Sequence, residues 1–226
     1  MWVEFKIIYT KMLRGFSGVN KLAHRLTKEP VKSSQPVRSF TLIIATALAV
    51  SSWAGELPQG ADIASGTVSV STAGKVMTIT QTSDQAAINW QDFDIGANST
   101  VNIVQPNSNA TILNRVVGLN PSQVFGSLNA NGKVVLINAN GIVFGENAQV
   151  NVGSLIASTL ALSSEDFQNN NYNFTNGKNA GALINHGSIT ADNTVLVAAT
   201  IENTGQINSN GVAFATGESV NVSFDN

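Results

Sequence analysis

Residues 113–159 read LNRVVGLNPSQVFGSLNANGKVVLINANGIVFGENAQVNVGSLIAST. At the centre of this stretch an apolar run, residues 134–137, meets Asn138-Ala139-Asn140-Gly141 and then resumes over residues 142–144. An apolar run that is rich in β-branched residues predicts a strand buried on both faces. Asn-Gly tolerates positive φ, so the chain turns sharply there. The commonest structure with such a dipeptide is a β-hairpin, and the rest of the chain must decide whether it applies here.

Internal repetition favours a different fold. The tetrapeptide Asn-x-Asn-Gly occurs at residues 129–132, 138–141 and 208–211. A second pattern, aliphatic-x-Asn-x-Gly-x-Ile, occupies residues 183–189 and returns at residues 201–207, an offset of 18 positions. A β-sandwich has short strands as well, but it does not predict the same residue types at a fixed offset. The repetition predicts the coils of a parallel β-helix, in which asparagine side chains at the corners can form ladders from coil to coil.

Composition and charge exclude several classes of function. From Gly55 onward the chain has four basic residues against twelve acidic ones, a net charge of −8, so it has no basic patch for a nucleic-acid backbone. The same region is rich in Asn, Ser, Thr and Gly, which indicates strands and turns. The absence of cysteine excludes disulfides, thiolate metal sites and cysteine nucleophiles.

Residues 1–54 have the pattern of an extended signal peptide. Residues 40–50 (FTLIIATALAV) are apolar over a length that suits a signal peptide and is too short to span a bilayer. Ser52 and Ala54 place small side chains at the −3 and −1 positions of a cleavage site. We therefore predict cleavage after Ala54, which leaves residues 55–226 as one domain.

Short alternating segments follow the predicted cleavage site. Residues 68–71 and 76–80 flank a turn and predict a hairpin. Residues 88–95 predict a strand with Ile88, Trp90 and either Phe93 or Ile95 turned inward. Further strands are predicted at residues 101–104 and 219–224, and the segment QNNNYNFTNGKN at residues 168–179 breaks the period as a loop or an excursion.

The chain resembles the secretion domain at the N-terminus of filamentous-haemagglutinin-like exoproteins, which are the passengers of two-partner secretion (TPS), and above all that of the high-molecular-weight adhesins. The resemblance runs from about Gly60 to Phe224. An upstream segment, residues 5–11 (FKIIYTK), resembles the extended signal peptides of such proteins, with Tyr9 where tryptophan is usual. The segments that carry the resemblance are Ile88–Ile95, Leu113–Val116, Val135–Ile142, Ala157–Leu160 and Ile184–Gly187.

Two departures from the family pattern concern its landmark motifs. The central motif is usually Asn-Pro-Asn-Gly-Ile, and Ala139 replaces its proline, so the backbone is not locked at that position. The family's Asn-Pro-Asn-Leu motif has no clear copy, and Gln105–Ser108 does not take over its role. The residues to which the resemblance assigns a secretion motif are Asn114, Arg115, Asn138, Asn140, Gly141 and Ile142.

The resemblance implies an all-β fold, a right-handed parallel β-helix with an N-terminal cap and small extra-helical hairpins. It implies the secretion-signal module of an adhesin- or haemagglutinin-like exoprotein, exported across the inner and outer membranes of a Gram-negative bacterium to its surface or beyond. The expected partner is an outer-membrane pore protein whose periplasmic domains capture the unfolded passenger, for which pairing with an exposed strand edge is a suitable mode. We expect a monomer without cofactor or metal, with a host surface or a glycan as a further candidate ligand.

The alternative is a β-helical carbohydrate-active enzyme or sugar-binding protein. Asp92 and Asp94 lie on one face of the predicted strand, and paired carboxylates cleave polysaccharides in some β-helices. We expect these acids to be solvated, and we expect Glu165 and Asp166 to be solvated in a loop. His186 has no second histidine after residue 54 to share a metal with. The sequence therefore predicts no enzyme.

Overall fold

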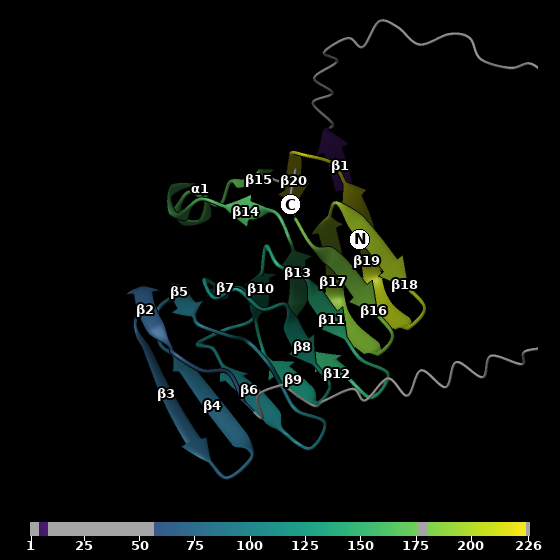
Figure 1. Cartoon of the computed structure of the whole chain (residues 1–226). Coiled ribbons are helices and arrows are strands. Elements are labelled where there is room, and N and C mark those ends of the chain that lie inside the picture. The colour runs from purple at the N-terminus through teal and green to yellow at the C-terminus, as the bar shows by residue number, and fades with distance from the viewer. Residues whose placement is uncertain (1–4, 9–56, 176–179, 225–226) are drawn as a thin grey trace, which may run out of the picture. The chain divides into compact units, whose positions relative to one another are not determined.

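The computed structural model describes residues 5–8, 57–175 and 180–224. These residues form a right-handed parallel β-helix of about six turns, which runs from the blue strands β2–β4 to the yellow strands β18 and β19 in Figure 1. The all-β prediction is confirmed.

Each coil contributes strands to three faces, which we call the covered, bare and third faces. Strands β17 (Ser188–Ala198) and β19 (Gln206–Thr216) run through the bare face and continue into the covered face. The covered face also contains β5 (Gln85–Trp90), β7 (Thr111–Val116), β10 (Lys133–Ile137) and β13 (Ser154–Ser158). The bare face also contains β4 (Val76–Gln81), β6 (Thr100–Val104), β9 (Ser127–Ala130) and β12 (Gln149–Asn151). The third face contains β8 (Ser122–Val124), β11 (Ile142–Phe144), β16 (Ala182–Asn185) and β18 (Thr200–Asn203).

The strand registers confirm the repeat of 18 residues. In the parallel pairs β16–β18 and β17–β19, Leu183 lies opposite Ile201 and Ile189 lies opposite Ile207. The three Asn-x-Asn-Gly copies, by contrast, are not equivalent. Residues 129–132 end β9 and turn toward β10, residues 138–141 join β10 to β11, and residues 208–211 lie inside β19. Only the aliphatic-x-Asn-x-Gly-x-Ile pattern therefore occupies equivalent positions in successive coils.

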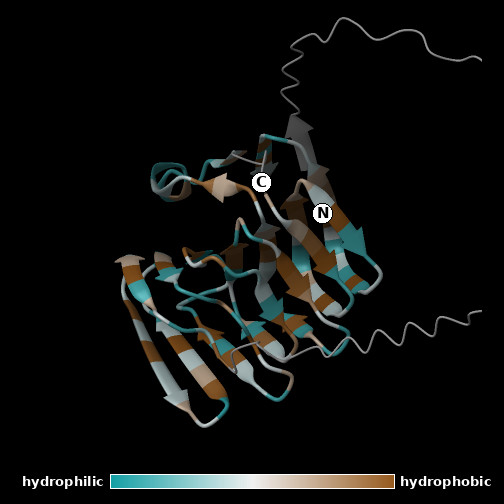
Figure 2. Ribbon diagram, in the orientation of Figure 1, coloured by the Kyte–Doolittle hydropathy of each residue, from teal (hydrophilic) through white to brown (hydrophobic). Residues whose placement is uncertain are grey.

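Antiparallel strands cap the first coil. Strand β2 (Asp62–Ser65) pairs with β5, and β3 (Val68–Ala73) pairs with β4 in the predicted hairpin. Its turn contains Gly74 at a φ of +59°, a conformation that L-residues rarely adopt. Apolar and polar residues alternate along these hairpin strands in Figure 2, as expected for strands with one buried face.

An extra-helical sheet packs outside the covered face. It consists of β14 (Ala161–Leu162), β15 (Tyr172–Thr175), β20 (Val220–Phe224) and β1 (Phe5–Ile8), with the short helix α1 (Ser164–Gln168) between β14 and β15. The excursion predicted for residues 168–179 therefore begins earlier and contains regular structure. Ser163 stabilises the start of α1 because its hydroxyl accepts a hydrogen bond from the Asp166 amide.

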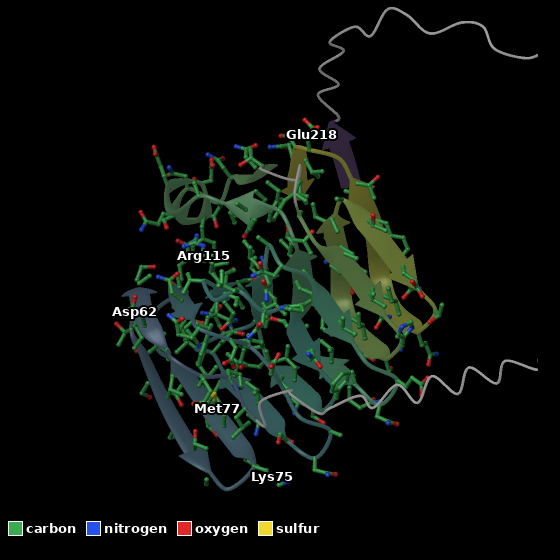
Figure 3. The ribbon with its side chains drawn as sticks, viewed as in Figure 1. Asp62, Lys75, Met77, Arg115 and Glu218 are labelled. Atoms are coloured by element: carbon green, nitrogen blue, oxygen red, sulfur yellow. The ribbon has the colours of Figure 1, made fainter. Side chains whose placement is uncertain are left out.

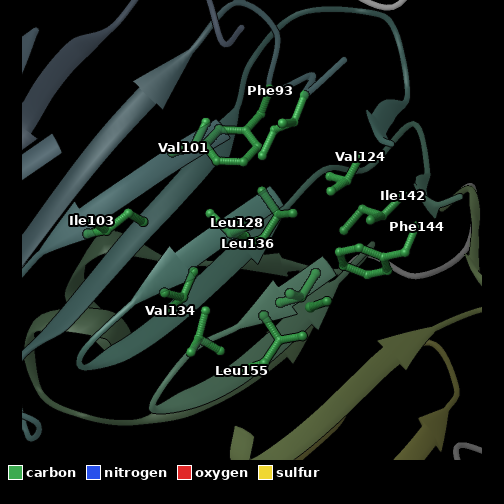
Figure 4. Close-up of a cluster of buried hydrophobic side chains, with 14 of the residues drawn as sticks. Phe93, Val101, Ile103, Val124, Leu128, Val134, Leu136, Ile142, Phe144 and Leu155 are labelled. Carbon is green, nitrogen blue, oxygen red and sulfur yellow. The ribbon is translucent and has the colours of Figure 1, made fainter. Parts of the chain in front are cut away.

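Two apolar cores lie on opposite sides of the covered face. The inner core fills the β-helix with Trp90, Leu136, Phe144 and other side chains, part of which Figure 4 shows. The outer core lies between the covered face and the extra-helical sheet and includes Val135, Phe174 and Val195. Strand β10 is thus buried on both faces, as its apolar run predicts.

The predicted strand at residues 88–95 is too long. Strand β5 ends at Trp90, because the chain turns a corner there: the Gln91 amide donates to Gln59 O, and the Val117 amide of the next coil donates to Trp90 O. Past the corner strict alternation no longer applies, and both Phe93 and Ile95 are fully buried. The other predicted strands correspond to β6 and β20.

The predicted signal peptide lies outside the described residues except for β1, which pairs antiparallel with β20. Cleavage after Ala54 therefore stays a prediction. No helix in the described ranges is long and apolar enough to cross a membrane.

Candidate functional site

The corner at Asn138–Gly141 joins β10 on the covered face to β11 on the third face. The two strands do not pair with each other, so the hairpin interpretation of Asn-Gly is wrong and the β-helix corner is confirmed. Gly141 has a φ of +128°, which favours glycine. Its carbonyl accepts a hydrogen bond of 2.9 Å from the Ser122 amide of the preceding coil.

Both asparagine side chains of this corner bind the preceding coil. Asn138 is fully buried, and its Nδ2 donates to Asn120 O at 2.9 Å and to Ser122 Oγ at 3.0 Å. Its Oδ1 accepts from the Asn140 amide at 2.9 Å. Asn140 Nδ2 reaches Gly118 O at 2.9 Å. The two amides therefore hold the loop between β7 and β8 in place.

The same corner also binds the following coil. The Asn138 amide donates to Ser158 O at the end of β13, and the Gly181 amide donates to Ala139 O at 2.8 Å. Gly181 lies where the chain returns from the extra-helical excursion, and a Cβ there would lie 2.3 Å from Asn140 O. Ile142 follows the corner as a fully buried residue of the inner core. One corner thus aligns three successive coils.

Asn114 lies one strand away, inside the β-helix. It pairs in register with Leu136 and is fully buried. Its Oδ1 accepts a hydrogen bond of 3.0 Å from Trp90 Nε1, while its Nδ2 has no partner. Asn114 belongs to β7 and not to the corner between β10 and β11, and it satisfies the buried indole of Trp90.

Arg115, the next residue, points outward and links the coils to the excursion. Its Nη2 donates to Leu162 O at 2.8 Å, and its Nη1 lies 3.4 Å from both Ser164 Oγ and Asn89 Oδ1. Figure 3 shows Arg115 between the coils and α1. Partial burial lowers the pKa of the guanidinium, which nonetheless stays charged. Arg115 therefore fastens the extra-helical segment at the point where it leaves the β-helix.

The predicted solvated pair of acids is not a pair on an exposed strand face. Asp94 is buried and its Oδ1 accepts a hydrogen bond of 2.7 Å from the Gln123 amide. Asp92 is partly buried, and its Oδ1 has no hydrogen-bond partner. Burial raises the pKa of Asp92, and a hydrogen bond from the Gln59 backbone opposes that rise. Both acids follow the end of β5, where the corner rather than strand alternation sets their directions.

The remaining polar candidates have structural partners. Asp166 Oδ2 accepts from Ser163 Oγ at 2.8 Å, so this residue belongs to the start of α1 and not to a solvated loop. His186 Nδ1 lies 2.5 Å from Thr204 Oγ1 in the next coil. Asn185, beside it, donates to Asn203 Oδ1 at 2.7 Å, which is the predicted corner ladder. The described part of the chain contains no group of three or more side chains that could hold a metal ion.

Sequence reasoning missed the corner's partners. Gly118, Asn120 and Gly181 contribute backbone groups, and such contacts leave no residue-type signature. The two glycines offered a signal, because a Cβ at Gly118 would lie 1.9 Å from Gln91 O and a Cβ at Gly181 would lie 2.3 Å from Asn140 O.

Comparisons with known proteins identify the family. Residues 54–225 match the TPS secretion domain model. The chain belongs to the TPS secretion domain family. Its β-helix superimposes on the crystal structure of the HMW1 secretion domain from Haemophilus influenzae with a TM-score of 0.70, at 33% sequence identity, covering 75% of this chain and 49% of that one.

Curated relatives place this TPS domain in longer proteins. A heme/hemopexin-binding protein of Haemophilus influenzae (strain ATCC 51907 / DSM 11121 / KW20 / Rd) is 40% identical over 154 residues, which is 66% of this chain and 17% of the relative. A second heme/hemopexin-binding protein from Haemophilus influenzae is 42% identical over 139 residues, covering 60% of this chain and 15% of the relative. The chain is thus the secretion domain of a two-partner-secreted exoprotein of Gram-negative type, and it spans about a sixth of the length of these relatives. The alternative, an enzyme or sugar-binding protein in place of a secretion domain, is not supported.

Proposed function

We propose that residues 55–226 are captured in the periplasm by the periplasmic domains of the exoprotein's outer-membrane pore partner and fold into the β-helix at the cell surface. The observation that carries this proposal is the match of residues 54–225 to a TPS secretion domain, since such a domain implies a pore partner. Removal of residues 1–54 after Ala54 precedes capture in this scheme.

The secretion motif acts through folding. Asn138, Asn140 and Gly141 bond to the coils on either side, so the corner forms only when three coils are in register. Arg115 then fastens the excursion, and Asn114 and Ile142 complete the interior. Folding of a domain releases about 5–15 kcal/mol, which opposes return of the chain through the pore. Export thereby gains direction without a nucleotide.

The domain works as a monomer and without catalysis. Asp94 Oδ1 accepts from the Gln123 amide, and both acids follow the end of β5 instead of pairing on one strand face. The names of the relatives describe binding. These names also support an exoprotein whose other regions bind a ligand such as heme or hemopexin. The domain itself acts as the secretion signal.

Export of the chain from a Gram-negative host, with and without the gene for its pore partner, tests the proposal. We expect the protein in the medium only when the partner is present, with Gly55 as its first residue in N-terminal sequencing. Equal export without the partner would contradict capture, and secreted protein that still begins at Met1 would contradict the cleavage site.

A further inference from the structure

A regular column of uncharged polar side chains crosses the bare face. We call it the polar column and define it by residues that pair in register from strand to strand. Each member is at least partly exposed. The column runs through Ser71, Thr78, Asn102, Asn129, Asn151, Thr190 and Asn208.

A second column lies two residues away on the same face. It continues from Ala73 and Val76 at the cap into hydrogen-bonding residues only: Thr100, Ser127, Gln149, Ser188 and Gln206. Neither column contains a charged residue. The columns are therefore uncharged and regular, while the exposed acidic side chain of Asp192 lies beside them on the same face.

Three of the four asparagines of the polar column are held in one orientation. Asn129 Nδ2 donates to Asn102 Oδ1 at 3.0 Å, and Asn151 Nδ2 donates to Asn129 Oδ1 at 3.3 Å. An amide has two N–H groups and an oxygen with two lone pairs, so this ladder leaves further donors and acceptors on each residue. Adjacent strands are about 4.8 Å apart, and the free groups repeat at that spacing.

The chemistry of the column selects its ligand. Absence of charge excludes nucleic acid and charged polymers, and the polar members offer nothing to a large apolar surface. Seven strands about 4.8 Å apart, read along three residues of each, present an area of about 300 Å², which is well below the roughly 800 Å² per partner of a stable protein–protein interface. A narrow, extended and hydroxyl-rich chain fits both the uncharged polar groups and the small area of the column.

We propose that the polar column binds an extended, uncharged glycan chain. The spacing of the amides is close to the advance of one sugar residue along an extended β-linked glycan. A hollow of about 300 Å³ beside the last strands, lined by Thr190, Asn208, Asp192 and neighbouring residues, offers room for a substituent of the sugar. This surface adds a binding role to a folded secretion domain, has no catalytic part, and does not depend on how the domain is exported.

Neither column contains an aromatic side chain, and this determines how the binding affinity depends on the length of the glycan. Binding relies on hydrogen bonds that repeat along the glycan, and linked contacts strengthen one another once the first has formed. We therefore expect a hexasaccharide to bind at least tenfold more tightly than the matching disaccharide.

The test titrates the full chain with cellohexaose and chitohexaose, and follows both affinity and the NMR signals of the Asn102, Asn129 and Asn151 side-chain amides. Cellobiose tests length, maltohexaose tests extended shape, and a heparin hexasaccharide tests charge. We expect the three amide signals to shift with at least one extended neutral hexasaccharide, and weaker binding of the other probes.

The variant Asn129→Lys places a charge in the middle of the column, and Gln123→Lys places one on the third face as a matched control. We expect at least a tenfold loss of affinity in the first and no change in the second. Asn129→Ser, which removes the amide but keeps a small polar group, serves if the lysine variant does not fold, with an expected loss of severalfold. Unshifted amide signals with both cellohexaose and chitohexaose, undiminished binding by the folded Asn129 variants, or preference for heparin would overturn the proposal.

Discussion

The two halves of β17 differ although they belong to one continuous strand. In its first half, on the bare face, Ile189 and Ala191 are buried while Thr190 and Asp192 are exposed. In its second half, on the covered face, every residue from Thr194 to Ala198 is buried. The difference comes from the extra-helical sheet, which covers only the second half. The pattern of buried and exposed residues in a strand thus indicates what packs against each of its faces, including a sheet formed by distant segments of the chain.

The largest expected effect on stability comes from removing a large buried side chain of the extra-helical sheet. Phe174 of β15 is fully buried in the outer core. Phe174→Ala removes its packing and leaves a cavity, so we expect the free energy of unfolding to fall by about 3–5 kcal/mol. Urea unfolding measures this change. A loss below about 1 kcal/mol would mean that the extra-helical sheet is only loosely attached.

A matched pair of valines compares the two faces directly. Val195 is fully buried on the covered face, and Val104 is 50% exposed on the bare face. Val195→Ala should cost about 2 kcal/mol, from two buried methyl groups and the cavity they leave. Val104→Ala should change stability by less than about 0.5 kcal/mol. Equal losses of unfolding free energy for the two variants, measured by thermal or urea unfolding, would show that packing of the extra-helical sheet does not distinguish the two faces.

Much of this comparison could be predicted from the sequence. The continuous apolar run at residues 134–137 predicted burial on both faces, and the 18-residue offset predicted which residues stack. The extra-helical sheet was not predictable, because β15 and β20 pair across a long separation in sequence. The three Asn-x-Asn-Gly copies show the same limit. A tetrapeptide makes a corner at residues 138–141 and continues a strand at residues 208–211, because neighbouring coils decide its conformation.

The candidate site was predictable in part. Asn138, Asn140 and Gly141 lie together at one corner, with amide bonds to the neighbouring coil and a positive φ at Gly141, as their motif predicts. Asn114 and Arg115 act elsewhere, on the inner and outer sides of β7. Their partners are an indole and a backbone carbonyl from other segments, and no local pattern could indicate those.

Loss of the fastening between the coils and the cover should have a smaller effect. Arg115→Ala removes the hydrogen bond to Leu162 O and the contact with Ser164. Because the side chain is half-exposed, we expect a loss of about 1 kcal/mol. Lys133→Ala, at an exposed lysine that begins β10, is the control and should be neutral. Hydrogen exchange should quicken in β14 and α1 of the Arg115 variant alone, and unchanged exchange there would contradict the fastening role.

Asp92, at the corner that follows β5, should have a small effect on stability that depends on pH. Burial raises the pKa of Asp92 in the folded protein, so the folded state holds this proton more tightly than the unfolded state does. Its contribution is most favourable at low pH and is lost as pH rises from the usual aspartate pKa of about 3.9 through the raised value. Relative to wild type, Asp92→Asn should therefore gain stability between pH 4 and pH 7. Urea unfolding at both pH values measures the gain, and a variant that loses stability relative to wild type over this range would contradict the sign.

Secretion of a variant with a broken corner tests the central claim, that coil registration at Asn138–Gly141 drives export. Asn138→Ala unpairs buried groups at a cost of about 1–3 kcal/mol, and Gly141→Val strains the backbone by about 1–3 kcal/mol at its positive φ. The control, Asn208→Ala with Gly211→Val, changes the same tetrapeptide inside β19, where its glycine does not have a positive φ.

The measurement is the amount of each protein in the medium of a host that carries the pore partner, together with the state of its signal peptide. We predict that the corner variant is cleaved after Ala54 but is not exported, while the β19 variant is exported like wild type. Wild-type export of a stably folded corner variant would contradict the claim and would make this corner one turn among many.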